Sequence, residues 1–279
     1  MTHKKILLEV CVDSFDSAKT AVDNGADRLE ICGSLCQGGG TTPSVALVNM
    51  IQSELPKLPL MIMIRPRPGD FVYSESEVRL MKAEIATFRR LRVMGVVFGC
   101  LKPDGMIDEL VTSELAACAG PLEVTFHRAF DMINYPSADG PLLWATSALC
   151  VLDTIPKITR VLTSGLQPTF PSSLSYIKSI IDQSVSLSKH SASSCPRRPL
   201  TILPGSGISA ASILAHPEFC QLLREGMFPE IHASCSSWVD GPMCMKARKE
   251  GMGMGRWERW KVMPARVREL REVLDGCVS

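Results

Sequence analysis

The stretch LLEVCVDSFDSAKTAVDNGADRLEICG, residues 7 to 33, holds the pattern that decides the fold. Residues 7–12 and 28–33 are short runs rich in aliphatic residues, which favour buried strands. Between them, Ser14 is a suitable N-cap for a helix, and Gly25 can end that helix. The stretch therefore predicts two parallel strands joined by a crossover helix.

The same alternation continues along the chain. Six further strand candidates follow, at residues 60–65, 95–100, 122–127, 160–165, 200–205 and 230–235. Eight strands alternating with helices fit a TIM-type (β/α)8 barrel, whereas a doubly wound sheet more often has five to seven. We expect an α/β fold with one such barrel domain over residues 1–279, a flexible insertion at 186–199 and an extra C-terminal helix at 264–276.

Composition limits the classes of partner. Hydrophobic residues make up 46% and charged residues 21% of the chain, and the net charge of +1 gives no electrostatic reason to expect nucleic acid or a membrane surface as partner. The first apolar run meets Glu9 and Asp13 too early for a signal peptide or a membrane span. The eleven cysteines include no CxxC pair, which favours reduced thiols. A cytoplasmic or nucleocytoplasmic location is therefore expected.

Polar residues gather where several predicted strands end, which is where TIM barrels carry their reactive groups. By alternation, Glu9 and Cys11 share one face of the first strand, and Glu30 and Cys32 share one face of the second. Buried charges cost several kcal/mol unless they are paired, so such a density favours a functional cluster over structural ion pairs. The candidate catalytic residues are Glu9, Glu30, Arg65, His127 and Asp131.

The fifth strand runs into His127, Arg128 and Asp131. Because neighbouring side chains on a strand point to opposite faces, at most one of His127 and Arg128 can point into the barrel. We expect this to be His127, with Arg128 turned outward or placed beside Asp131.

A candidate anion site follows the seventh and eighth strands. Gly205 and Gly207 in LPGSGIS would let backbone amides approach an anion, and this is the usual phosphate position of TIM barrels. A helix turn that needs small residues explains the glycines equally well. The expected anion-binding residues are Arg67, Gly205, Ser206, Gly207 and Ser234.

Cysteines on adjacent strands suggest a metal site. The spacing of Cys32 and Cys36 does not match a zinc knuckle, but thiolates suit Cu(I), and Cys11 with Cys32 is the expected ligand pair. The alternative is that both thiols simply pack as small apolar groups. The methionines in MCM (243–245) and GMGMG (251–255) are weaker soft-donor candidates.

Six strings occur in a characteristic order: LEVCVDS, GADRLEIC, GGGTTPS, MIRPRPGDFVYS, EVTFHRAFDM and RVLTSG. In this respect residues 7 to about 209 resemble the CutC family of copper homeostasis proteins, whereas the tail after IHAS departs from the family. The resemblance implies a TIM-type barrel, Cu(I) binding or another role in copper handling, a homo-oligomer, and a location in the cytoplasm and also in the nucleus.

Three functions stay open at this point. The first is a copper homeostasis protein, with a copper ion as its partner. The second is an enzyme of the lyase or isomerase class that acts on a small phosphorylated or carboxylated metabolite, since no nicotinamide fingerprint, P-loop or Ser-His-Asp spacing is present. The third is a scaffold, which predicts a charged cluster locked into salt bridges with no open cavity.

Overall fold

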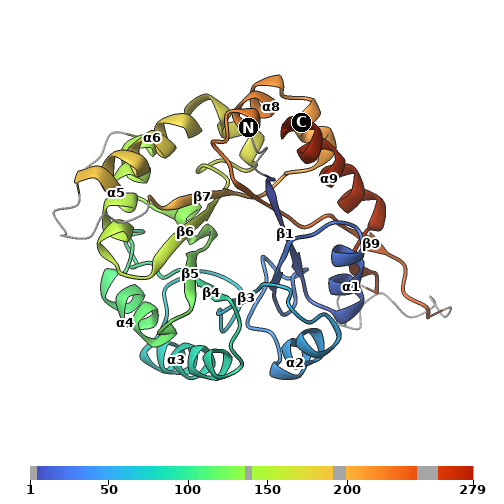
Figure 1. Cartoon of the computed structure of the whole chain (residues 1–279). Helices are drawn as coiled ribbons and strands as arrows, with labels where there is room; N and C mark the ends of the chain where they lie inside the picture. Colours follow the sequence, from blue (N-terminus) through green and yellow to red (C-terminus); the bar gives the residue numbers. More distant parts are fainter. Residues whose placement is uncertain (1–4, 136–139, 191–198, 244–256, 279) are drawn as a thin grey trace.

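The chain folds into a nearly closed parallel barrel. The computed structural model describes residues 5–135, 140–190, 199–243 and 257–278. Hydrogen bonds join the strands in the order β7-β6-β5-β4-β3-β2-β1-β8, and β7 contacts β8 without a ladder between them. This confirms the predicted TIM-type barrel (Figure 1). The strands are β1 (Leu7–Val12), β2 (Arg28–Ile31), β3 (Leu60–Met63), β4 (Gly95–Phe98), β5 (Glu123–Phe126), β6 (Ile158–Thr163), β7 (Thr201–Pro204) and β8 (Glu230–Ala233).

Helices form a ring outside the strands (Figure 1). The side chain of Ser14 caps the first helix, as the sequence predicts, and Ser44 caps the second helix in the same way. The C-terminal helix packs outside the barrel, against α1, α7 and α8. The helices are α1 (Phe15–Asp23), α2 (Val45–Glu54), α3 (Glu75–Arg90), α4 (Glu109–Ala119), α5 (Pro141–Thr154), α6 (Leu174–His190), α7 (Ala210–Leu214), α8 (Pro217–Arg224) and α9 (Pro264–Val278), with two 3-10 turns, η1 (Arg128–Met132) and η2 (Phe170–Ser173).

The predicted insertion at 186–199 differs from expectation. Helix α6 continues to His190, so the first residues of the predicted insertion at 186–199 are helical, and residues 191–198 lie outside the described part. The serine-rich composition of residues 186–199 suggested a loop. Just before this segment, Ser184 of the same helix is buried, and its hydroxyl donates to the carbonyl oxygen of Leu200. No helix among the described residues is long and apolar enough to cross a membrane.

An antiparallel hairpin that the sequence did not reveal follows the barrel. It consists of β9 (Ser236–Val239) and β10 (Arg259–Val262), in which Trp238 lies opposite Trp260 with ring centroids 5.3 Å apart. Such cross-strand aromatic pairs stabilise hairpins. The methionine strings at 243–245 and 251–255 fall between these strands; Met243 is exposed, and the other residues of both strings lie outside the described part of the chain.

Candidate functional site

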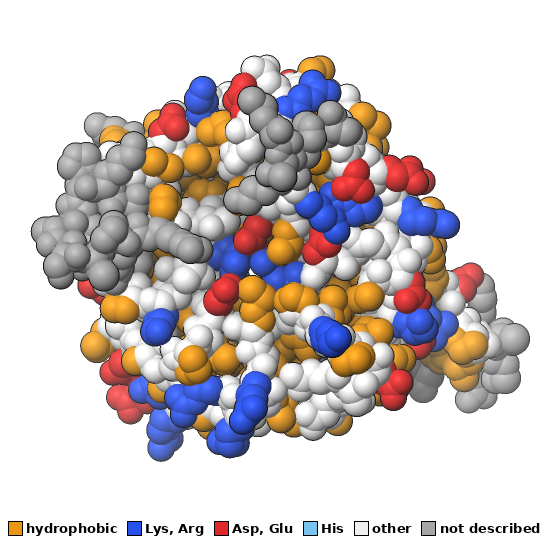
Figure 2. Space-filling model, viewed as in Figure 1, with side chains coloured by type: hydrophobic (Ala, Val, Ile, Leu, Met, Phe, Trp, Pro, Cys, Tyr) orange, Lys and Arg blue, Asp and Glu red, His pale blue; other side chains and the backbone are white. Residues whose placement is uncertain are grey.

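Charged side chains fill one layer of the barrel interior. The Arg28 side chain is fully buried; its Nε donates to Glu9, and its Nη2 donates to Glu230 Oε2 at 2.5 Å. Arg160 donates to the same Glu230 carboxylate at 2.7 Å and to Glu123 at 3.1 Å. Charged side chains are also visible near the middle of one face of the molecule (Figure 2). Part of the predicted polar cluster is therefore a structural ion-pair network, and Glu9 belongs to it.

A second cluster brings together a thiol, a carboxylate and an imidazole. The strand register pairs Cys11 with Glu30 and Glu9 with His232. Donor atoms of Cys11, Glu30 and His232 all lie within 4.8 Å of one another. Cys32 is fully buried beside this cluster, and its Sγ donates to Glu30 Oε2 at 3.4 Å.

His232 is the member that the sequence did not assign to a site. Its Nδ1 donates to Glu9 Oε1 at 2.7 Å, which leaves Nε2 facing Glu30 at 3.9 Å. A carboxylate behind an imidazole is the arrangement that fixes a histidine for metal binding or proton transfer. The signal was present in the sequence as a histidine near the end of the eighth strand, but only barrel closure places it beside Glu9.

The pKa values of these groups are strongly shifted by burial and by each other. Burial would raise the pKa of Glu9, but Arg28 and the hydrogen bond from His232 lower it to about 2. Burial would lower the pKa of His232, but Glu30, Cys11 and the Glu9 hydrogen bond raise it well above its usual value. Burial also raises the pKa values of Glu30 and Cys32. These partners therefore favour the protonated form of His232.

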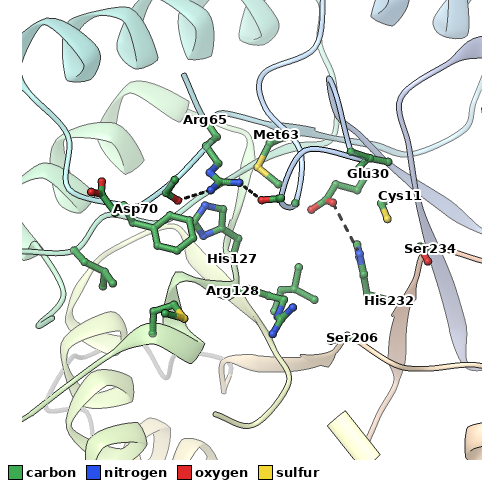
Figure 3. A pocket seen from close by; sticks show the side chains of 18 of the residues that line it. Cys11, Glu30, Met63, Arg65, Asp70, His127, Arg128, Ser206, His232 and Ser234 are labelled. Carbon is green, nitrogen blue, oxygen red and sulfur yellow. Dashed lines mark hydrogen bonds and ion pairs between the residues drawn. The ribbon is translucent and has the colours of Figure 1, made fainter. Parts of the chain in front are cut away.

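An open pocket of about 1070 Å³ lies against this cluster. The close view places Arg65 and His127 on one side of it and Cys11, Glu30 and His232 on the other (Figure 3). A cavity of this size is in the range of small-molecule sites and contradicts the scaffold hypothesis, which required none. Ser206, Gly207 and Ser234 of the expected anion site also line it.

The turn after β7 has free backbone donors. Ser206 and Gly207 both have a φ of +72°, and their amides donate to no other described residue. A Cβ at position 207 would lie 2.7 Å from the Cβ of Thr169, so this turn requires glycine there for space as well as for conformation. Gly205 does not line the pocket; it packs beneath it, against Leu162 and His232.

Two expected site residues lie elsewhere. Arg67 does not line the pocket, because its guanidinium donates to Glu77 at 2.6 Å and to Asp70 at 3.0 Å. Asp131 is also absent from the lining; its carboxylate accepts from the amides of Ser164 and Leu166 and so holds the turn after β6. The structure gives these two residues positioning roles outside the pocket.

The prediction for His127 and Arg128 is met only in part, because β5 ends at Phe126 and both side chains line the pocket. His127 lines the pocket, and Arg128 donates to Asp131 Oδ2 at 2.8 Å and to Ser164 Oγ at 2.9 Å. Arg128 also reaches the pocket rim, but its charge is paired there.

Comparisons with known proteins agree with this architecture. Residues 6–216 match the model of the CutC family. The chain is 38% identical to the copper homeostasis protein cutC homolog of Homo sapiens over 250 residues, which cover 89% of this chain and 80% of that protein. It is 33% identical to the homolog of Dictyostelium discoideum, covering 91% of this chain and 90% of the other. A crystal structure of CutC from Streptococcus agalactiae superposes with a TM-score of 0.68 at 24% identity, over 82% of this chain and 98% of that one. The chain therefore belongs to the CutC family.

Proposed function

We propose that this protein binds Cu(I) as its cargo, through Cys11, His232 and Cys32. The observation that carries the proposal is the cluster in which Cys11, Glu30 and His232 present donor atoms within 4.8 Å of one another. Thiolate and imidazole ligands suit Cu(I), whereas carboxylate oxygens suit harder cations. The copper homeostasis names of the relatives from Homo sapiens and Dictyostelium discoideum point the same way.

The residues around the cluster fit this role. Metal-binding histidines commonly donate their second ring N–H to a carboxylate, and His232 donates its Nδ1 hydrogen to Glu9. Arg28 in turn holds Glu9 in place. The ion would replace the proton on His232 Nε2. Cys32 is hydrogen bonded to Glu30 but does not belong to the group of donor atoms within 4.8 Å, so its side chain would have to turn toward the ion to supply the second thiolate. Cys11 lines the open pocket, so the ion has a route to the cluster.

Replacing His232 with Ala should weaken Cu(I) binding by at least about tenfold, because it removes the imidazole donor. The measurement is an anaerobic titration of the metal-free protein with Cu(I) in competition with a chromogenic chelator. His216→Ala is the matched control, since His216 lies between α7 and α8 and bonds to the Ser212 carbonyl. If the wild type and His232→Ala bound Cu(I) with equal affinity, the imidazole of His232 would not be a ligand of the proposed site.

The pocket also favours a second function, that of a TIM-barrel enzyme of the lyase or isomerase class that acts on a small anionic metabolite. The specific observation is Arg65, a buried cation that lines the pocket and forms no ion pair with any described carboxylate. Glu30, whose pKa burial raises, would be the group that gives or takes a proton. The amides of Ser206 and Gly207 offer further donors to an anion.

A thermal-shift screen tests this second function. A carboxylated or phosphorylated metabolite that fits should raise the melting temperature of the wild type by several degrees, because a ligand at about 100 times its Kd adds roughly 2.7 kcal/mol to stability. Arg65→Ala should abolish the shift, while Arg67→Ala should keep it. If no metabolite raised the melting temperature of the wild type, and Arg65→Ala melted at the same temperature as the wild type in every condition, the result would count against this function.

A further inference from the structure

Arg65 has hydrogen-bond donors that the protein does not use. Its side chain is nine-tenths buried or more, and its Nη1 donates to the carbonyl oxygens of Gly38 at 2.7 Å and Gly40 at 3.2 Å. Its Nη2 donates to the Gly69 carbonyl at 2.6 Å, and its Nε has no partner among the described residues. Three backbone carbonyls therefore hold the guanidinium in one position, and no described carboxylate forms an ion pair with it, although its charge helps to lower the pKa of Asp70 in the same pocket lining.

His127 presents a second unused donor. Its Nδ1 accepts a hydrogen bond from the Ala129 amide at 3.2 Å, so the ring proton resides on Nε2, which is buried without a partner in the described structure. Burial, then the charges of Arg65 at the end of β3 and Arg128 on its own turn, lower the pKa of His127 to about 3. The imidazole is therefore neutral at physiological pH and acts as an N–H donor.

The His127 ring is held rigidly beside Arg65. The Phe71 ring lies 4.9 Å from it in an edge-on arrangement, and the Arg65 guanidinium lies 4.9 Å from the same Phe71 ring. A Cβ at Gly99 would come within 2.6 Å of His127 Nδ1, so glycine leaves the space that the ring fills. Figure 3 shows Arg65 and His127 next to each other at the pocket.

Two unpaired buried donors at one cavity wall indicate a missing acceptor. Buried polar groups are nearly always hydrogen bonded, and a donor without a partner costs free energy. An oxygen of a bound ligand would satisfy both groups. A carboxylate has two oxygens in one plane, so it can accept hydrogen bonds from the planar Arg65 guanidinium and from the His127 N–H at the same time.

We propose that Arg65 and His127 together bind one carboxylate group of a small organic acid, with His127 donating its Nε2 hydrogen to it. This inference rests on the second function proposed above and narrows its ligand to a carboxylate at this wall of the pocket. The copper cluster lies on the opposite wall and is not required for it.

The test uses oxalate as the carboxylate probe and inorganic phosphate as the competing anion, each titrated calorimetrically into metal-free protein. Oxalate should bind the wild type, and His127→Leu should weaken it about tenfold because one hydrogen bond to a charged group is lost. His127→Gln keeps an N–H donor near the position of Nε2 and should stay within about threefold of the wild type. Phosphate should bind more weakly than oxalate.

Imidazole ¹⁵N spectra of the wild type test the same proposal without any core substitution, with His127→Gln used only to assign the resonance. His127 should show the neutral form with its proton on Nε2 from pH 8 to pH 5.5, and that resonance should move when oxalate is added. A proton on Nδ1, or oxalate binding that is equal in the wild type and His127→Leu, overturns the proposal. Binding of phosphate without oxalate also overturns it, while leaving the broader small-anion function in place.

Discussion

An Arg28→Met variant should lose about 3–5 kcal/mol of unfolding free energy, the usual cost of removing one partner from a buried ion pair. Arg28 is fully buried and donates to both Glu9 and Glu230. Methionine fills a similar volume, so the loss comes mainly from the two carboxylates left in the barrel with fewer positive partners. Arg160 still contacts Glu230, and Glu9 keeps its hydrogen bond from His232, but no other described cation bonds to both Glu9 and Glu230.

Urea unfolding at several pH values checks this result. The pKa of Glu9 is lowered to about 2, so its contribution to stability is complete above the unfolded-state pKa of about 4.3 and is lost as the pH falls toward 2. The deficit of Arg28→Met should therefore shrink over that window. Lys19→Met removes the exposed pair with Asp23 and should change stability by less than about 1 kcal/mol. An equally small effect of Arg28→Met would mean that the network does not stabilise the barrel.

The sequence was sufficient for the barrel because each strand is a local signal. Runs such as residues 7–12 are apolar enough to be recognised as strands from the sequence alone. Ser14 and Ser44 mark the starts of helices because they form local hydrogen bonds there. The hairpin of β9 and β10 was missed because its strands are short and pair across a long separation in sequence. Long-range pairing leaves little trace in local composition.

The site was predictable in its residue types but not in its partners. Alternation correctly placed Glu9 and Cys11 on one face, yet the stagger between strands pairs Cys11 with Glu30 and not with Cys32. His232 enters the cluster only because β8 closes against β1. These offsets are set by how the strands tilt in a closed barrel, which no single segment encodes.

The different environments of Arg65 and Arg67 could not be predicted from the sequence either. Alternation would put both on one face, but β3 ends at Met63 and the chain then turns, so Arg65 stays in the barrel and Arg67 leaves to pair with Glu77. Which arginine remains unpaired depends on α3, where Glu77 also accepts from the Ser74 amide in a capping box.

A Cys11→Ser/Cys32→Ser variant should bind Cu(I) at least about 100-fold more weakly than the wild type, since it removes both thiolate donors, and loss of outer-shell partners alone costs about 10- to 100-fold. Serine is close to cysteine in size, so the fold should be kept. The control is Cys100→Ser/Cys277→Ser, which replaces two other buried thiols away from the cluster and should keep the wild-type affinity.

The most direct measurement of copper ligation is the Cu K-edge absorption spectrum of the Cu(I)-loaded wild type, compared with those of the two double-cysteine variants. Binding at Cys11, Cys32 and His232 predicts sulfur together with imidazole scattering in the wild type and in Cys100→Ser/Cys277→Ser. The sulfur contribution should disappear in Cys11→Ser/Cys32→Ser. Copper bound in the wild type by nitrogen and oxygen alone, or a sulfur signal that survives in Cys11→Ser/Cys32→Ser, would contradict the proposed site.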